Sequence, residues 1–196
     1  VQELFLQIMS VSRRYQYRVI GDQDHVIEKM FTKIAHLNIT DKTKVVYAGV
    51  PGAFAETAMI GYFGEKINGS NVKDFHEVAQ SVAEGKADYG VLPIENSTAG
   101  FVNGIYDLLD RFSLSIVGEQ KVCVNQCLLG IPGTELSDVK TVFSHPQGLM
   151  QSKEYLEQTD WKQVSMANTA LSAKKVHDDM DKTQVAIASQ RAAQIY

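Results

Sequence analysis

The chain has few cysteines, no cluster of basic residues and no long apolar stretch, and each shortage excludes a class of protein. Two cysteines among 196 residues, Cys123 and Cys127, cannot build a disulfide framework, which favours a reducing compartment. The formal charge is −4, from 19 Lys and Arg against 23 Asp and Glu, and this argues against a nucleic-acid partner. No apolar run approaches the ~18 residues that cross a bilayer, and the first residues lack the pattern of a signal peptide. We therefore expect a cytoplasmic protein with no membrane contact.

The first 20 residues have the spacing of an amphipathic helix. Apolar side chains recur every three or four positions, at Val1, Leu4, Phe5, Ile8, Val11, Tyr15 and Val19. One helix alone cannot bury such a stripe, so it packs on the main domain, contacts a second copy, or ends an upstream helical domain. Residues 21–43 are polar and mixed, and we interpret them as a linker.

From residue 44 onward, strand-like segments alternate with helix-like segments. This alternation is typical of β–α–β units, which form a parallel sheet with helices on its faces, so the fold class is α/β. Strands are expected at 45–50, 72–75, 89–94, within 114–131, and at 139–143, 163–166 and 185–188. Helices are expected at 53–63, 77–84, 102–109, 149–158, 169–177 and 190–196.

Four predicted strand-to-helix turns share a composition of Gly, Ser, Asn and Thr. They are residues 50–54, 93–98, 143–147 and 166–170. Ligands of such sheets bind beyond the carboxyl ends of the strands, and helix N-termini attract anions. Ordinary helix capping explains any single turn. Four turns on one edge favour a site for a small acid with two carboxylates, held without a cluster of arginines.

Five motifs in the same order resemble those of the prephenate dehydratase family. They are Gly49-Val-Pro-Gly-Ala-Phe-Ala-Glu-Thr-Ala58, Gly90-Val-Leu-Pro-Ile-Glu-Asn-Ser-Thr-Ala-Gly100, Phe143-Ser-His-Pro-Gln-Gly-Leu-Met-Gln151, Asn168-Thr-Ala-Leu-Ser-Ala173 and Val185-Ala-Ile-Ala-Ser-Gln-Arg-Ala-Ala-Gln-Ile-Tyr196. The resemblance implies two α/β lobes around a cleft, as in type 2 periplasmic binding proteins, with an α-helix before them. Lobe one would be 44–118 and lobe two 119–196, entered along a strand at 119–129.

The segment 1–20 resembles the last helix of helical chorismate mutases, which are often fused ahead of the dehydratase in one bifunctional chain. Ser12 and Gln16 match the polar pair that this helix gives to the mutase pocket, and their spacing puts them on one helix face. The other mutase helices are absent from the sequence. We therefore expect no mutase activity from this chain alone.

The chain also departs from the dehydratase pattern. The family's Thr-Arg-Phe motif, expected downstream of Tyr196, is absent, and so is the phenylalanine-sensing regulatory domain. Position 53 is Ala where the family commonly has Thr, which puts a hydroxyl contact there in doubt. The resemblance therefore predicts a truncated dehydratase, and whether it is active without the missing segment is left open.

The family reaction implies which residues carry the chemistry. Prephenate loses CO2 and water to give phenylpyruvate on the route to L-phenylalanine, and aromatisation drives the reaction without a cofactor or metal. A strong cation would hold back the departing carboxylate, so uncharged donors suit the site. The resemblance makes Asn96, Ser144 and Gln151 catalytic. It makes the substrate-binding residues Gly52, Ala53, Phe54, Ser97, Thr98, His145, Asn168, Thr169 and Ala170. A homodimer or higher homo-oligomer is expected.

Other readings stay open at this point. His145 fits a general acid or a structural donor equally well, whereas Glu95 would repel an anionic substrate and is expected to point away. The remaining histidines have no metal-ligand spacing, and Cys123 and Cys127 are expected in the core. The rival function is a non-catalytic protein of the same two-lobed fold that only binds a small anion.

Overall fold

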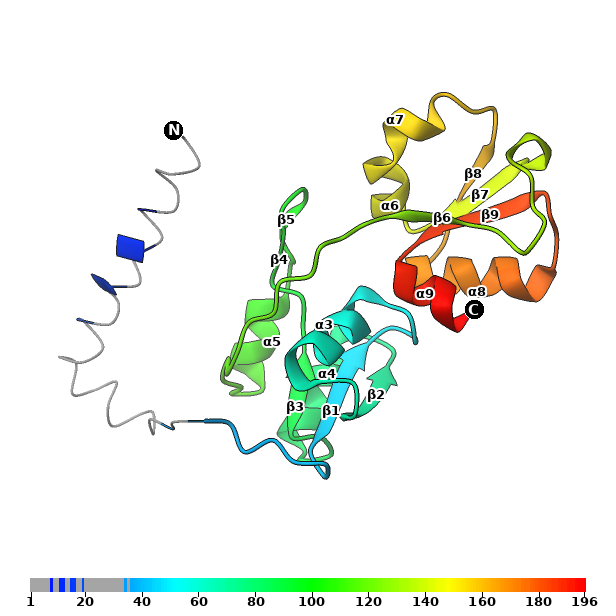
Figure 1. The fold of residues 1–196 in the computed structure, drawn as a ribbon. Helices are drawn as coiled ribbons and strands as arrows, with labels where there is room; N and C mark the ends of the chain where they lie inside the picture. Colours follow the sequence, from blue (N-terminus) through cyan, green and yellow to red (C-terminus); the bar gives the residue numbers. More distant parts are fainter. Residues whose placement is uncertain (1–7, 9–10, 13–14, 17–18, 20–33, 35) are drawn as a thin grey trace. The chain divides into compact units, whose positions relative to one another are not determined.

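The computed structural model describes residues 8, 11–12, 15–16, 19, 34 and 36–196, in two compact units of residues 1–38 and 39–196 (Figure 1). In the first unit, the six described positions between residues 8 and 19 are all helical, as their spacing predicts. The apolar side chains among them are exposed, Val11 and Tyr15 to about two thirds. The rest of the predicted helix 1–20 and most of the predicted linker 21–43 lie outside the described residues.

The first sheet of the larger unit is parallel and three-stranded, in the order β2-β1-β3. Its strands are β1 (Lys44–Ala48), β2 (Asn68–Val72) and β3 (Tyr89–Val91), and its helices are α3 (Phe54–Phe63) and α4 (Phe75–Ala83). Successive residues of β1 point to opposite faces, so Val46 packs toward α4 and Tyr47 toward α3. Helices on both faces explain why β1 is buried and apolar from Val45 to Ala48.

A short antiparallel hairpin follows the first sheet. It consists of β4 (Glu95–Asn96) and β5 (Gly100–Phe101), and α5 (Ile105–Arg111) comes after it. Gly100 has a φ of +78°, in the left-handed region that a tight reversal of the chain requires. The segment from 114 to 126 then runs to the second sheet without helix or strand.

The second sheet has the order β6-β9-β7-β8, with β6 antiparallel and the others parallel. Its strands are β6 (Cys127–Leu129), β7 (Thr141–Ser144), β8 (Lys162–Ser165) and β9 (Gln184–Ala188). Its helices are α6 (Pro146–Gln151), α7 (Lys153–Leu156), α8 (Thr169–Asp179) and α9 (Gln190–Ile195), with the 3-10 helix Leu136–Asp138. Figure 1 shows α8 and α9 on one face of this sheet and α6 and α7 on the other. The sheet has one buried cluster on each face: the cluster around Phe143 packs against α8 and α9, and the cluster around Leu156 packs against α6 and α7.

Several predicted elements were wrong. The second strand is Asn68–Val72 rather than 72–75, because Asp74 caps α4 by accepting from the Glu77 N–H at 3.0 Å. Only Cys127–Leu129 forms a strand within 114–131, and Ile116 and Val117 are exposed. A strand needs a neighbouring strand, and β propensity at 114–126 does not supply one. The segment predicted as one helix at 149–158 is broken at Ser152, between α6 and α7.

One of these corrections concerns the four turns. Residues 93–98 lead into the β4–β5 hairpin, so no helix begins there, and α5 starts only at Ile105. The α/β fold class itself is confirmed by both sheets. Within the described residues, none of the helices has both the length and the apolarity to span a membrane.

Candidate active site

Two groups of contacts join the segments around the first sheet to those around the second. We call the first the buried joint. It contains Pro51, Gly52 and Glu56 on one side and Ser189, Arg191, Ala192 and Tyr196 on the other. We call the second the polar joint, and it contains Asn96, Thr98, Gln126, Gln147 and Gln151. Both joints involve turns that follow the C-terminal ends of strands, the edge where the sequence predicts a site.

The buried joint depends on Gly52. Its φ of +87° lies in the left-handed region, and a Cβ there would come within 2.9 Å of the Ala192 Cα. The Ser189 hydroxyl donates to the Gly52 carbonyl at 2.7 Å and accepts from the Ala192 N–H at 3.0 Å, which caps α9. Only glycine lets the two backbones approach this closely.

Glu56 occupies the donor groups around this turn. Its carboxylate accepts from the Gly52 N–H at 2.8 Å and from the Arg191 Nε at 3.4 Å. The adjacent Tyr47 is buried, and burial together with the charge of Glu56 raises the pKa of its phenol to about 12. The Gly52 N–H and the Arg191 cation are thus paired within the protein, and the Ala53 N–H donates to the Val50 carbonyl at 3.1 Å.

The polar joint starts at Asn96. The Asn96 Oδ1 accepts from the Thr98 N–H at 2.9 Å, from the Thr98 hydroxyl at 2.7 Å and from the Ala99 N–H at 3.2 Å. These bonds order the tip of the β4–β5 hairpin in the way that Asn orders turns. Ser97 lies exposed at the same tip.

The hairpin tip is connected to α6 through Thr98. Its Oγ1 accepts from the Gln151 Nε2 at 3.1 Å and from the Gln147 Nε2 at 3.3 Å. Gln151 in turn accepts at Oε1 from the Gln126 Nε2 at 2.9 Å. The five residues form one hydrogen-bonded network, and none of these side chains is ionisable.

Ser144 and His145 are engaged locally at the end of β7. Ser144 is fully buried, and its hydroxyl donates to the Ile187 carbonyl at 2.7 Å. The His145 Nδ1 accepts from the Gln147 N–H at 3.2 Å and thereby caps α6. This contact favours the structural role for His145 over the general acid.

Gly148 brings the starts of α6 and α8 together. A Cβ there would lie 2.5 Å from the Ser144 Oγ and 3.4 Å from the Thr169 Cγ2. Asn168 caps α8 by accepting from the Leu171 N–H at 2.8 Å, and Ala170 is fully buried in the core. The turns that contain Ser144 and Thr169 therefore lie close together, on either side of Gly148.

Three of the predicted residues, Phe54, Ser12 and Gln16, are described by their own elements. Phe54 is half-buried at the first position of α3. Ser12 and Gln16 are exposed helical residues of the other unit. Whether any of the predicted residues touches a ligand stays a prediction, since these are contacts within the protein.

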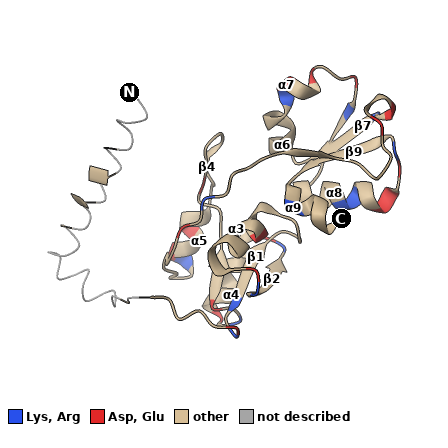
Figure 2. Ribbon diagram, viewed as in Figure 1, with Lys and Arg blue, Asp and Glu red and all other residues tan. Residues whose placement is uncertain are grey.

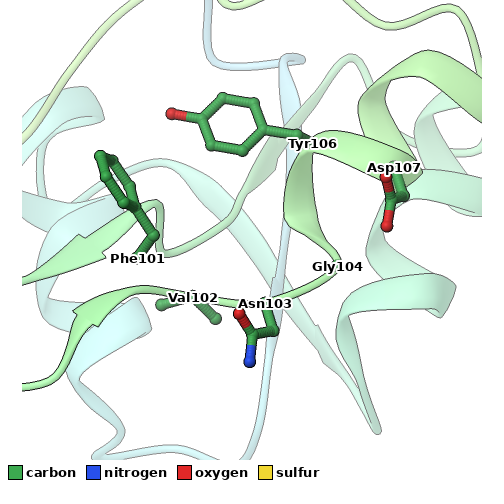
Figure 3. A pocket seen from close by; sticks show the side chains of 6 residues that line it. All are labelled: Phe101, Val102, Asn103, Gly104, Tyr106 and Asp107. Carbon is green, nitrogen blue, oxygen red and sulfur yellow. The ribbon is translucent and has the colours of Figure 1, made fainter.

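A first pocket of about 310 Å³ lies between β5 and α5, and a larger one of about 470 Å³ lies along residues 150–155, with Gln151 in its lining. Figure 3 shows the side chains that line the first pocket, among them Phe101, Tyr106 and Asp107. The ring centroids of Phe101 and Tyr106 are 6.3 Å apart, and all residues that line this first pocket lie between 101 and 107. An acidic, local pocket of this kind does not suit a dianion. Figure 2 shows Lys and Arg spread over separate elements of the described chain.

Six residues of the two joints were not predicted as site residues: Gln126, Gln147, Glu56, Ser189, Arg191 and Tyr196. The signal for Ser189 was present, because it follows a buried strand and precedes a helix like the serine and asparagine of the other turns. Gln126 had no such signal. It reaches the site because β6 is antiparallel to β9, with Cys127 opposite Ala188.

Comparison with known proteins gives a consistent result. The family model described as prephenate dehydratase matches residues 45–196. A bifunctional chorismate mutase/prephenate dehydratase of Buchnera aphidicola subsp. Schizaphis graminum is 34% identical over 190 residues, which cover 95% of this chain and 49% of that protein. Arogenate dehydratase/prephenate dehydratase 1 of Arabidopsis thaliana is 40% identical over 155 residues, 79% of this chain and 39% of that protein. The chain spans about half the length of the curated relatives it matches.

Two solved structures resemble the fold. One is described as GqqA, a novel type of quorum quenching acylase, and matches with a TM-score of 0.71 and 32% identity over 78% of this chain and 55% of that one. The other is the prephenate dehydratase of Staphylococcus aureus, with a TM-score of 0.63 and 27% identity over 79% of this chain and 57% of that one.

Proposed function

The chain belongs to the prephenate dehydratase family, and from this premise we propose that the protein containing it converts prephenate to phenylpyruvate, CO2 and water. The observation that carries the proposal is the uncharged polar joint, in which Asn96, Thr98 and Gln151 are connected by hydrogen bonds across the hairpin and α6.

The chemistry explains why uncharged groups suit this reaction. The bond between the ring and its carboxylate breaks, and the electron pair enters the ring as the ring hydroxyl departs. The departing oxygen takes up a proton and leaves as water. A cation on the carboxylate would stabilise the ground state, whereas neutral amide and hydroxyl donors orient the substrate without that cost. Removing one well-placed donor of this kind costs ~10²–10³ in rate.

We propose Asn96 and Gln151 as residues that touch the substrate, and Ser144, the third residue predicted as catalytic, as their support. The turns around Gly52 and Thr169 would hold the substrate through groups other than the Gly52 N–H, which donates to Glu56. Ser144 fits a supporting position, because its hydroxyl is committed to the Ile187 carbonyl. The proposal includes two lobes of the type 2 periplasmic-binding-protein kind, 44–118 and 119–196. It also includes a homo-oligomer in the cytoplasm, and Ser12 and Gln16 as a mutase-like remnant.

The acylase relative suggests a second activity that the site does not favour. An acylase needs an activated nucleophile, and the described residues pair neither Ser144 nor Thr98 with a histidine. A protein that only binds a small anion is the remaining alternative.

The test is to mix prephenate with the complete natural protein and with the 196-residue chain, and to follow phenylpyruvate. We expect turnover by the complete protein and a fall in kcat/KM of about 100-fold on Asn96→Ala or Gln151→Ala. Asn103→Ala is the matched control, because Asn103 is a nearby exposed amide outside the polar joint. Binding of prephenate without turnover by the complete protein would overturn the enzymatic proposal in favour of the anion-binding one.

A further inference from the structure

The Gln126 side chain, just before β6, forms a hydrogen bond with one residue of the described chain, Gln151. It stands one position before β6, beside the C-terminal end of β9 where Ser144, Ser189 and α9 meet. Its Nε2 donates to the Gln151 Oε1 at 2.9 Å. Its own Oε1 is buried and has no hydrogen-bond partner within the described part of the chain. The hydrogen bonding of this side chain therefore goes through Gln151.

The bonds around Gln151 have a direction. A carboxamide donates at its nitrogen end and accepts at its oxygen end. Gln151 accepts from Gln126 and donates to Thr98, and the Thr98 hydroxyl donates to Asn96. If the amide of Gln151 turned over, two N–H2 groups would face one another at Gln126, and its carbonyl would face Thr98. With the Gln126 amide in its observed orientation, turning Gln151 over would lose the hydrogen bond between the two glutamines.

We propose that Gln126 is a positioning residue for the dehydratase reaction, because it holds the Gln151 amide with its N–H2 group toward Thr98 and the hairpin tip. The inference rests on the proposed function and adds a residue to it. Gln126 would act through Gln151 and touch no reacting atom. A neutral amide is needed here, because a carboxylate could only accept.

If Gln126 only stabilised the fold, Gln126→Leu would lower the free energy of unfolding. Replacing it with leucine removes one hydrogen bond and, with it, a buried carbonyl oxygen that has no partner. The two changes oppose one another in their effect on stability. We therefore expect Gln126→Leu to fold with nearly the stability of the parent protein, and its defect to fall on the orientation of Gln151.

The experiment uses the complete natural protein and two variants. Gln126→Leu should lower kcat about tenfold with KM nearly unchanged, as loss of a group's positioning does. Gln126→Glu should lower kcat further at neutral pH, because its carboxylate turns the Gln151 amide over. It should recover relative to the parent as the pH falls toward 5, because a protonated carboxyl group can donate again. Asn125→Ala is the control and should behave as the parent.

A second measurement needs no substrate. The side-chain N–H2 signals of Gln151, followed by NMR after 15N labelling, should shift and exchange faster with solvent in Gln126→Leu. Unchanged signals together with unchanged kcat would overturn the positioning role, while turnover by the parent would still support the proposed function. If the parent protein fails to turn over prephenate, the proposed function falls and the catalytic meaning of the positioning falls with it.

Discussion

The buried joint and the polar joint connect the same two halves of the larger unit by opposite means. At the buried joint, Gly52 packs against the backbone of Ala192, and the Ser189 hydroxyl satisfies a buried carbonyl. At the polar joint, long amide side chains reach an exposed threonine, Thr98, at the tip of a two-strand hairpin. Closely packed backbones are held in a single arrangement, whereas long glutamine side chains can adopt several rotamers.

From this difference we expect the buried joint to contribute mainly to stability and the polar joint mainly to activity. The buried joint has its polar groups paired within the protein, Glu56 with the Gly52 N–H and Arg191. We therefore expect changes there to lower the free energy of unfolding. The polar joint presents neutral amides near the surface, and we expect changes there to lower activity with little effect on stability. Substitutions at the two joints are therefore expected to range from a large loss of stability to almost none.

The largest effect is expected at Gly52. Gly52→Ala places a side chain in a left-handed conformation, which costs roughly 1–2 kcal/mol, and overpacks the Ala192 backbone, which costs roughly 1–3 kcal/mol more. Urea unfolding should show a loss of roughly 2–5 kcal/mol. Gly85→Ala is the matched control, because Gly85 also has a positive φ, +69°, but no atom within 4 Å of an added Cβ. Equal losses in both variants would mean that the contact with α9 contributes nothing.

Ser189→Ala should come next. It removes the cap of α9 and leaves the Gly52 carbonyl without its donor. We expect a loss of about 2 kcal/mol in the free energy of unfolding. Ser165→Ala is a control at the exposed end of β8 and should stay within about 0.5 kcal/mol of the parent. A loss at Ser189 no larger than at Ser165 would contradict the importance of the buried joint.

Tyr47 should make the core beneath the buried joint sensitive to alkali. Its pKa is raised to about 12 by burial and by Glu56, whereas an unfolded tyrosine has a pKa of about 10. The unfolded chain loses its proton first, so stability is fully present below pH ~10 and falls as the pH rises toward 12. At pH ~11 the loss should be about 1 kcal/mol larger in the parent than in Tyr47→Phe.

The comparison between these two proteins isolates Tyr47, because every other titrating group is present in both. Tyr155→Phe, at an exposed position of α7, should keep the alkaline loss of the parent. Parallel pH dependence of the parent and Tyr47→Phe in urea unfolding would contradict the raised pKa.

The smallest effect on stability is expected at the polar joint. Thr98→Val removes the hydroxyl that links Asn96, Gln147 and Gln151, but at an exposed position. We expect a change of less than about 0.5 kcal/mol in stability and a fall of about tenfold in kcat/KM. Thr98→Ser keeps the hydroxyl and should keep most of the activity. A stability loss as large as that of Ser189→Ala would remove the contrast between the joints.

Local patterns predicted a large part of this fold. The helices at 53–63, 169–177 and 190–196 were predicted within a few residues of their observed ends, because apolar spacing and N-terminal Ser and Asn are read locally. The strands after residue 139 were predicted equally well. The segment 114–126 was not, because its apolar residues have strand propensity and yet lie beside no other strand in the described part of the chain.

The sequence predicted several residues of the candidate site, but it did not predict how they are arranged. Asn96 and Gln151 were named from their motifs, and the structure connects them through Thr98. Gln126 lies in none of those motifs, and the turn at 93–98 forms a hairpin where a helix start was expected. Their roles toward a substrate remain predictions.

The sequence by itself determined the α/β class, the strands after residue 139, several helices and the residue types of the candidate site, because each depends on neighbours within a few positions. Only the tertiary structure decided that Gly52 meets Ala192 and that Gln126 holds Gln151. Those contacts join residues 140 and 25 positions apart in the chain, respectively. Strand order and side-chain direction bring them together, and neither is encoded in a local pattern.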